Sequence, residues 1–207
     1  MNKGANDKEV FMKIDLDKIT SRQKLTISKG LCDYQYIMDN WEKDDADFRD
    51  VYYEFYLKAR WAKMKKEENR EPYFNKLQHI SPEANLMDIL DELKEEMASG
   101  SYELSIGSKL LHTRNSAFPI YDSKVREYLM NNEEVDFWWN VSGTSRPPRT
   151  SKKEQIRHDW EILCNWYQNI LASERGRQWV EWFDENFSTY KHISDVKKVD
   201  FIIFATN

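Results

Sequence analysis

The sequence predicts an all-α protein. Glycine and proline are scarce, at six and five among 207 residues, so few positions interrupt a helix. Apolar residues recur at spacings of three and four over long stretches, which is the period of a helix face rather than of a strand. Hydrophobic residues make up 40% of the chain and aromatic residues 14%, so the chain can bury a core and is not a disordered polymer. We therefore expect one helical domain spanning residues 1–207.

Two amphipathic stretches open the helical part of the chain. Large apolar residues recur at helical spacing over 31–41 and again over 48–59. The charged run "KMKKEENREP" follows, and we expect Pro72 to close a loop there. The stretch that begins with the capping residue Ser81 and ends with Gly100 is the clearest helix of the chain.

The C-terminal third begins with the best candidate for a long exposed loop. Residues 139–153 contain two adjacent prolines and several other loop-forming residues. After this loop, apolar spacing predicts helices over 156–170 and 179–187. Ser194 is expected to cap the final segment, in which "VDFIIF" suits either a helix or a strand.

Charge and cysteine usage narrow the function classes. With 31 basic and 36 acidic side chains the net charge is -5, so any nucleic-acid site must be a local basic face. Cys32 and Cys164 form no CxxC motif and are expected to be buried free thiols. The four histidines lack metal-ligand spacing, so neither a metal nor another cofactor is expected. No signal peptide or membrane span is recognisable, which favours a cytoplasmic protein with no membrane partner.

One segment combines groups that could carry chemistry. In "SIGSKLLHTRNSAFPIYDSK" we expect one helix from Ser105 to about Thr113, with Lys109 in its first turn, and another helix capped by Asp122. A lysine attacks a sugar carbon only as a neutral amine, which burial or nearby positive charge favours. A capping aspartate is held by backbone donors and can stabilise positive charge on a deoxyribose as the base leaves. Taken singly, each residue more often has a structural role, as a surface lysine or a simple cap.

The order of these elements resembles the helix-hairpin-helix DNA glycosylases, and among them the 8-oxoguanine glycosylase-like group. Residues 106–109 (IGSK) are similar to the hairpin motif V-G-x-K, and Pro119 with Asp122 resembles the family's P-V-D element with one extra residue. Ser105 stands where the hairpin has a glycine, and Leu104 where it has a proline. The motif's lysine precedes the aspartate by 13 positions, fewer than in typical members. The matched motif covers about 25 residues.

The resemblance implies a fold, an activity and a partner. It implies a helical glycosylase domain with the hairpin and active site at about 83–130, and a DNA glycosylase with possible AP-lyase activity. Lys109 would form the Schiff base, Asp122 would assist, and the partner would be a damaged or modified DNA duplex. Both DNA repair and defence against phage with modified bases stay open as the cellular task. Two alternatives also stay open: a noncatalytic DNA-binding helix-hairpin-helix protein, and a helical protein-interaction module.

DNA contacts are expected from the hairpin region and from an exposed basic loop at about 140–153, which concentrates positive charge on an acidic chain. A base-excising enzyme also needs an aromatic pocket for the extruded base. The predicted DNA-contacting residues are Gly107, Ser108, His112, Arg114, Lys124, Arg146, Arg149, Lys152 and Lys153, and the predicted base pocket is Tyr121, Trp138 and Trp139. The structural alternatives are a solvated charged surface and tryptophans of the core.

Overall fold

The computed structural model describes residues 14–58, 64, 66–98, 100–133, 135–138 and 150–206. Within these ranges the protein is helical and contains no strand, so the predicted all-α class is confirmed. None of the described helices is both long and apolar enough to cross a membrane. The elements, in chain order, are η1 (Leu16–Lys18), α1 (Ser21–Asn40), α2 (Ala46–Tyr52), η2 (Tyr53–Leu57), α4 (Glu67–His79), α5 (Leu86–Glu96), α6 (Leu104–Arg114), α7 (Ser123–Asn132), α8 (Lys152–Ala172), α9 (Glu174–Asn186), η4 (Ser188–Tyr190) and α10 (Asp195–Thr206).

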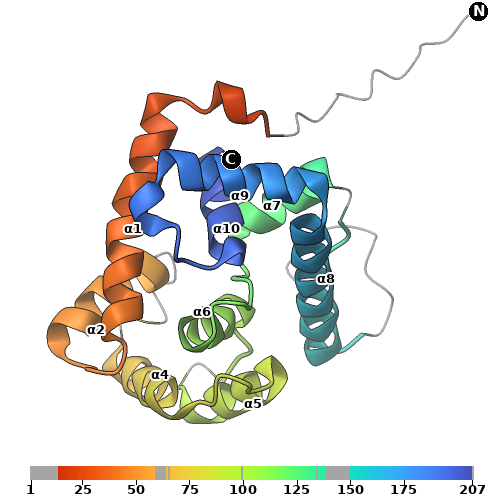
Figure 1. Ribbon diagram of the computed structural model, residues 1–207. Helices are drawn as coiled ribbons and strands as arrows, with labels where there is room; N and C mark the ends of the chain where they lie inside the picture. The colour runs from red at the N-terminus through yellow and green to blue at the C-terminus, as the bar shows by residue number, and fades with distance from the viewer. Residues whose placement is uncertain are drawn as a thin grey trace, which may run out of the picture.

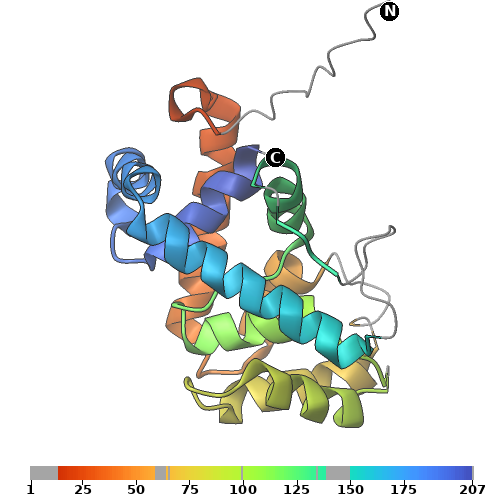
Figure 2. The same cartoon turned by 90° about the vertical axis from the view of Figure 1, so that its right-hand side faces the viewer.

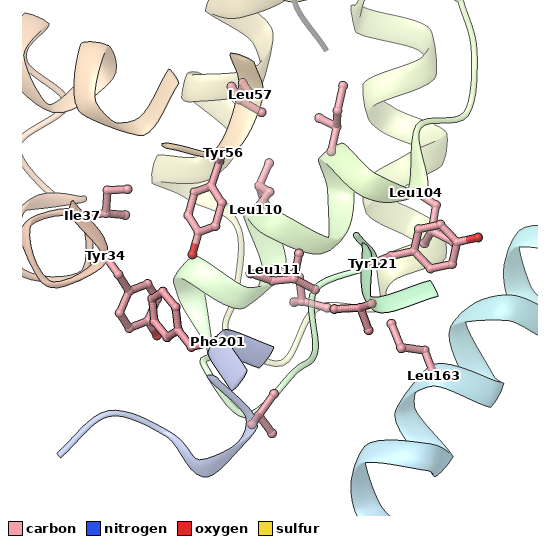
Figure 3. Packing of buried hydrophobic residues seen from close by; sticks show 14 of the residues in the cluster. Tyr34, Ile37, Tyr56, Leu57, Leu104, Leu110, Leu111, Tyr121, Leu163 and Phe201 are labelled. Atoms are coloured by element: carbon pink, nitrogen blue, oxygen red, sulfur yellow. The ribbon is translucent and has the colours of Figure 1, made fainter. Parts of the chain in front are cut away.

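Helix α6 lies in the middle of the molecule (Figure 1). Every residue from Leu104 to Thr113 is buried, so this helix has no solvent face except at its C-terminal end. Helices α4 and α5 pack against α6 from one side, whereas α10 packs against α1, α7 and α9 on the other side (Figures 1 and 2). Figure 3 shows Leu110 and Leu111 of α6 among side chains from α1, α8 and α10. Two strongly buried helices, α6 and α10, thus form the interior of the fold.

Several helix ends agree with the expected caps. The Asp122 side chain accepts the N–H of Lys124 at 2.9 Å and caps α7, as predicted. Ser194 precedes α10, and its Oγ accepts the N–H of Lys197 at 3.3 Å. The final segment is therefore a helix, and its alternative interpretation as a strand is wrong. This helix packs against α1, α7, α8 and α9, which explains why every residue from Val196 to Ile203 is buried.

Two predicted boundaries are wrong. Pro72 lies inside α4, whose buried side chains Tyr73, Phe74 and Leu77 favour the helix despite the missing N–H. The next helix begins at Leu86 rather than near Ser81, because the Asn85 side chain accepts the N–H of Met87 at 2.8 Å and supplies the cap. Side-chain caps and burial in the tertiary structure determine these boundaries. Neither can be predicted from the spacing of apolar residues alone.

The cysteines are free, as predicted, but they are not deeply buried. Cys32 is exposed on α1, with its Sγ 3.5 Å from the Tyr190 hydroxyl, and Cys164 on α8 is half-buried. The larger part of the predicted exposed loop, residues 139–149, lies outside the described residues. The predicted site residues Trp139, Arg146 and Arg149 belong to that stretch.

Candidate active site

Gly107 lies at the point of close approach between α6 and α5. A Cβ atom at this position would be 2.6 Å from Leu90 Cδ2 and 3.2 Å from Leu86 Cδ1. The missing side chain is what allows the two helices to pack so closely. Gly107 is therefore a buried packing residue within α6 rather than part of a hairpin turn, and the predicted DNA contact at Gly107 is wrong.

Ser108 is also internal. Its hydroxyl accepts the N–H of Tyr121 at 3.0 Å and donates to the Ser105 carbonyl at 3.3 Å, and the residue is fully buried. These bonds tie the segment before α7 to α6. The predicted DNA contact at Ser108 is wrong, because no surface of this side chain is accessible.

Lys109 is the sixth residue of α6, one turn later than predicted, but its side chain folds back toward the first turn. Its Nζ donates to the Ser105 hydroxyl at 2.7 Å and to the Ser105 carbonyl at 3.1 Å. Only 6% of the residue is exposed. The amine is thus fixed near the N-terminal end of α6 and largely shielded from bulk water.

Lys109 and Asp122 line the same cavity, which has a volume of about 340 Å³. This volume lies in the range of small-molecule binding sites in proteins. We call it the α6–α10 cavity, because these helices carry its charged groups together with the cap of α7. Its lining consists of Thr26, Ile27, Gly30, Phe55, Tyr56, Ser105, Lys109, Ile120, Asp122, Ser123, Lys197, Asp200, Phe201, Phe204 and Ala205.

A second charged pair lines this cavity, and sequence reasoning missed it. Lys197 Nζ lies 2.6 Å from Asp200 Oδ2, and both residues are almost completely buried. The Lys197 amine is also surrounded by aromatic rings, with ring centroids at 4.7 to 5.6 Å. Those rings belong to Phe201, Tyr34, Phe55 and Tyr56. The spacing of Lys197, Asp200, Phe201 and Phe204 was the available signal, since intervals of three and four place residues on one helix face.

The four charged side chains of the cavity interact electrostatically through Asp200. Burial raises the pKa of Asp200, the positive charge of Lys197 opposes that rise, and the negative charge of Asp122 adds to it. Lys109 lowers the pKa of Asp200 by a smaller amount. The charges of both predicted catalytic residues therefore affect the pKa of Asp200.

His112 is a core residue. Its Nδ1 lies 2.6 Å from the Phe118 carbonyl and its Nε2 lies 3.1 Å from the Tyr34 hydroxyl. This geometry assigns the proton to Nδ1, which donates, and the lone pair to Nε2, which accepts. Burial, together with the positive charge of Lys197, lowers the pKa of His112 to about 3. A neutral and fully buried imidazole has no role at the DNA surface, so that prediction is wrong for His112.

The other predicted DNA-contacting residues of this region also make intramolecular contacts. Arg114 Nε donates to the Ile80 carbonyl at 3.0 Å, and its guanidinium lies 3.6 Å from the centroid of the Trp41 ring. Lys124 Nζ donates to the Phe204 carbonyl at 3.2 Å and lies 4.4 Å from the centroid of the Phe204 ring. Lys124 therefore stands beside a residue that lines the cavity, whereas Arg114 supports the packing of α6.

Lys152 and Lys153 open α8, away from the cavity. Lys153 forms an ion pair with Asp91 of α5, and Lys152 is exposed. Both ribbon views show this end of α8 beside α5, far from the chain's C-terminus (Figures 1 and 2). No residue of α8 lines the cavity.

The predicted base-pocket residues that the structure describes, Tyr121 and Trp138, lie outside the cavity. The Tyr121 hydroxyl donates to Asp159 Oδ2 at 3.1 Å, and its ring points toward α8 (Figure 3). The backbone N–H of Trp138 donates to Asp159 Oδ1 at 2.7 Å, and its ring stacks on His158. Neither ring lines the cavity, whose aromatic lining residues are instead Phe55, Tyr56, Phe201 and Phe204.

Neither a family model, nor a curated protein, nor a solved structure matches the chain. The described residues include no group of three or more histidine, cysteine, aspartate or glutamate side chains arranged to hold a metal ion. The cavity is lined by two lysines, two carboxylates and four aromatic rings.

Proposed function

We propose that the protein is a DNA glycosylase with AP-lyase activity, in which Lys109 is the nucleophile and Asp122 supports cleavage of the glycosidic bond. One observation carries the proposal: a buried lysine amine and a capping carboxylate, 13 positions apart in the sequence, line one cavity. The sequence resemblance assigns the same two residues, but residues 106–109 lie within α6 rather than in a hairpin turn.

The setting of Lys109 suits a nucleophile. Its amine donates to the Ser105 hydroxyl and carbonyl, which fix its position, and the residue is largely withdrawn from water. In the proposed reaction the lone pair of the neutral amine attacks C1′ of the sugar, and the base departs with the electrons of the C1′–N bond.

The setting of Asp122 suits a stabilising carboxylate. Its Oδ1 accepts the N–H of Lys124 at the first turn of α7, which fixes the position of the carboxylate. Positive charge that develops on the deoxyribose as the base leaves would be stabilised by this carboxylate.

The walls of the cavity suit an extruded base. Phe55 and Tyr56 come from η2, a five-residue π-helix, a type of element that often occurs at functional sites. Phe201 and Phe204 come from α10, and Phe204 is 41% exposed. Stacking on such rings is the usual way in which proteins hold an unstacked base.

The test is covalent trapping. The protein is incubated with duplexes carrying an abasic site or an oxidised guanine, borohydride is added, and the protein–DNA adduct is resolved on a denaturing gel. We expect an adduct with the wild type, its loss in Lys109→Gln, and its retention in Lys191→Gln, which changes an exposed lysine. Absence of an adduct and of strand cleavage across a broad lesion panel would overturn the proposal. Salt-sensitive DNA binding without cleavage would then favour a noncatalytic DNA-binding protein.

A further inference from the structure

The α6–α10 cavity contains two lysines and two carboxylates, although the proposed reaction assigns roles to only one of each. Lys197 and Asp200 are the unassigned pair, and both line the cavity with Lys109 and Asp122. At neutral pH the four groups sum to zero charge when all are ionised. The cavity therefore offers two carboxylates, Asp122 and Asp200, that could accept a proton from Lys109.

A lysine beside a single carboxylate is a poor nucleophile, because the opposite charge stabilises the ammonium. The reaction needs a neutral Lys109 and an ionised Asp122 at the same time. If Asp122 accepted the lysine proton, the carboxylate needed to stabilise the sugar would be lost. A second carboxylate in the same cavity removes this conflict.

We propose that Asp200 accepts the proton that Lys109 must lose, and that Lys197 is the positioning residue that holds the Asp200 carboxylate. This inference rests on the proposed function. Transfer of one proton from the Lys109 ammonium to Asp200 gives a neutral amine and a carboxylic acid. The transfer leaves the total charge of the cavity unchanged and does not involve the Asp122 carboxylate, which stays available for the sugar.

The geometry of the Lys197–Asp200 pair suits this role. Lys197 Nζ is 2.6 Å from Asp200 Oδ2, and the rings of Phe201 and Tyr34 lie against the Lys197 amine at 4.7 and 5.2 Å. The two residues are three positions apart on α10 and therefore share one face of that helix. The ion pair and the rings together fix the position of the carboxylate.

The groups around Asp200 favour a carboxyl that can take up a proton. Burial and the charge of Asp122 raise its pKa, whereas Lys197 and Lys109 oppose the rise. The phenols of Tyr34 on α1, Tyr56 on η2 and Tyr167 on α8 also interact with Asp200, and burial raises the pKa of all three. These phenols stay neutral in the working pH range, so they do not compete for the proton.

With an abasic-site substrate, the proton that Asp200 takes from Lys109 is used in a later step of the reaction. The Lys109 amine adds to the C1′ aldehyde and forms a carbinolamine. The Asp200 carboxylic acid then returns its proton to the departing hydroxyl, and water leaves as the iminium forms. One ammonium and one aldehyde thus give one iminium ion and one water, with Asp200 regenerated as a carboxylate.

The experiment measures the rate of borohydride trapping on an abasic-site duplex from about pH 6 to about pH 10. Asp200→Asn is compared with the wild type and with Asp33→Asn, which changes an exposed carboxylate on α1. We expect Asp200→Asn to lower the rate about a hundredfold near neutral pH, since general-base catalysis contributes on this scale. The rate should recover as the pH rises, because solvent then deprotonates Lys109.

The alternatives give different results. A merely structural role would lower the rate by the same factor at every pH, and a simple charge-partner role would raise the rate near neutral pH. Either result overturns the inference while leaving the proposed function intact. If the wild type forms no adduct, both fail together. If Asp200→Asn does not fold, the double variant Lys197→Gln/Asp200→Asn replaces the ion pair with a neutral pair and must show the same pH-dependent loss.

Discussion

The buried His112 should make the protein sensitive to mild acid. In the folded protein its pKa is about 3, whereas an unfolded histidine has a pKa of about 6.5. The unfolded state therefore binds a proton that the folded state excludes between these values, so stability falls as the pH decreases below about 6.5. Between pH 7 and pH 5 the expected loss is about 2 kcal/mol of unfolding free energy, because each unit between the two pKa values contributes about 1.4 kcal/mol.

Urea unfolding at these two pH values tests the prediction. His112→Gln has no group that titrates in this range, so its unfolding free energy should change by about 2 kcal/mol less than that of the wild type. His79→Gln is the matched control, because His79 is exposed and its loss should leave the full pH dependence in place. An equal pH dependence in wild type and His112→Gln would show that His112 is not held neutral in the core.

The other predictions concern packing and the cavity. Gly107→Ala places a Cβ too close to Leu90 in the contact between α6 and α5, at a cost of about 1–3 kcal/mol of unfolding free energy in urea, offset in part by the roughly 1 kcal/mol better helix propensity of alanine; a net gain of about 1 kcal/mol would contradict this packing. Tyr121→Phe should cost about 1–3 kcal/mol, because it removes the hydroxyl that donates to the buried Asp159. The trapping rate of folded Tyr121→Phe should equal that of the wild type. A loss of trapping without a loss of fold would indicate that Tyr121 contacts the base. On a duplex that carries oxidised guanine, Phe204→Ala should lower the trapping rate roughly 5- to 150-fold, the equivalent of one lost stacking contact with the base, with little change in melting temperature; an unchanged rate would exclude Phe204 from base binding.

The sequence was informative where one local signal decides the structure. Helical spacing predicted the all-α class, and the position of Asp122 before an amphipathic stretch predicted the cap of α7. The same segment identified the lysine and the aspartate that the fold brings to one cavity. These features depend on residues within a few turns of one another.

The missed features depend on distant contacts. His112, Gly107 and Ser108 look accessible in a polar stretch, yet all three are buried in α6, against which α4 and α5 pack. Lys197 and Asp200 lie about 90 positions after Lys109, and neither periodicity nor local motif connects α10 with α6. The aromatic lining likewise comes from η2 and α10, because the sequence contains too many aromatic residues to indicate which ones face a cavity.

Identification of the trapped residue tests the proposed chemistry most directly. The borohydride-reduced adduct on an abasic-site duplex is digested, and the peptide that carries the sugar remnant is sequenced by mass spectrometry. We expect the remnant on the amine of Lys109. A remnant on Lys197 or on an exposed lysine, or no remnant on any peptide, would contradict the assignment of Lys109 as the nucleophile.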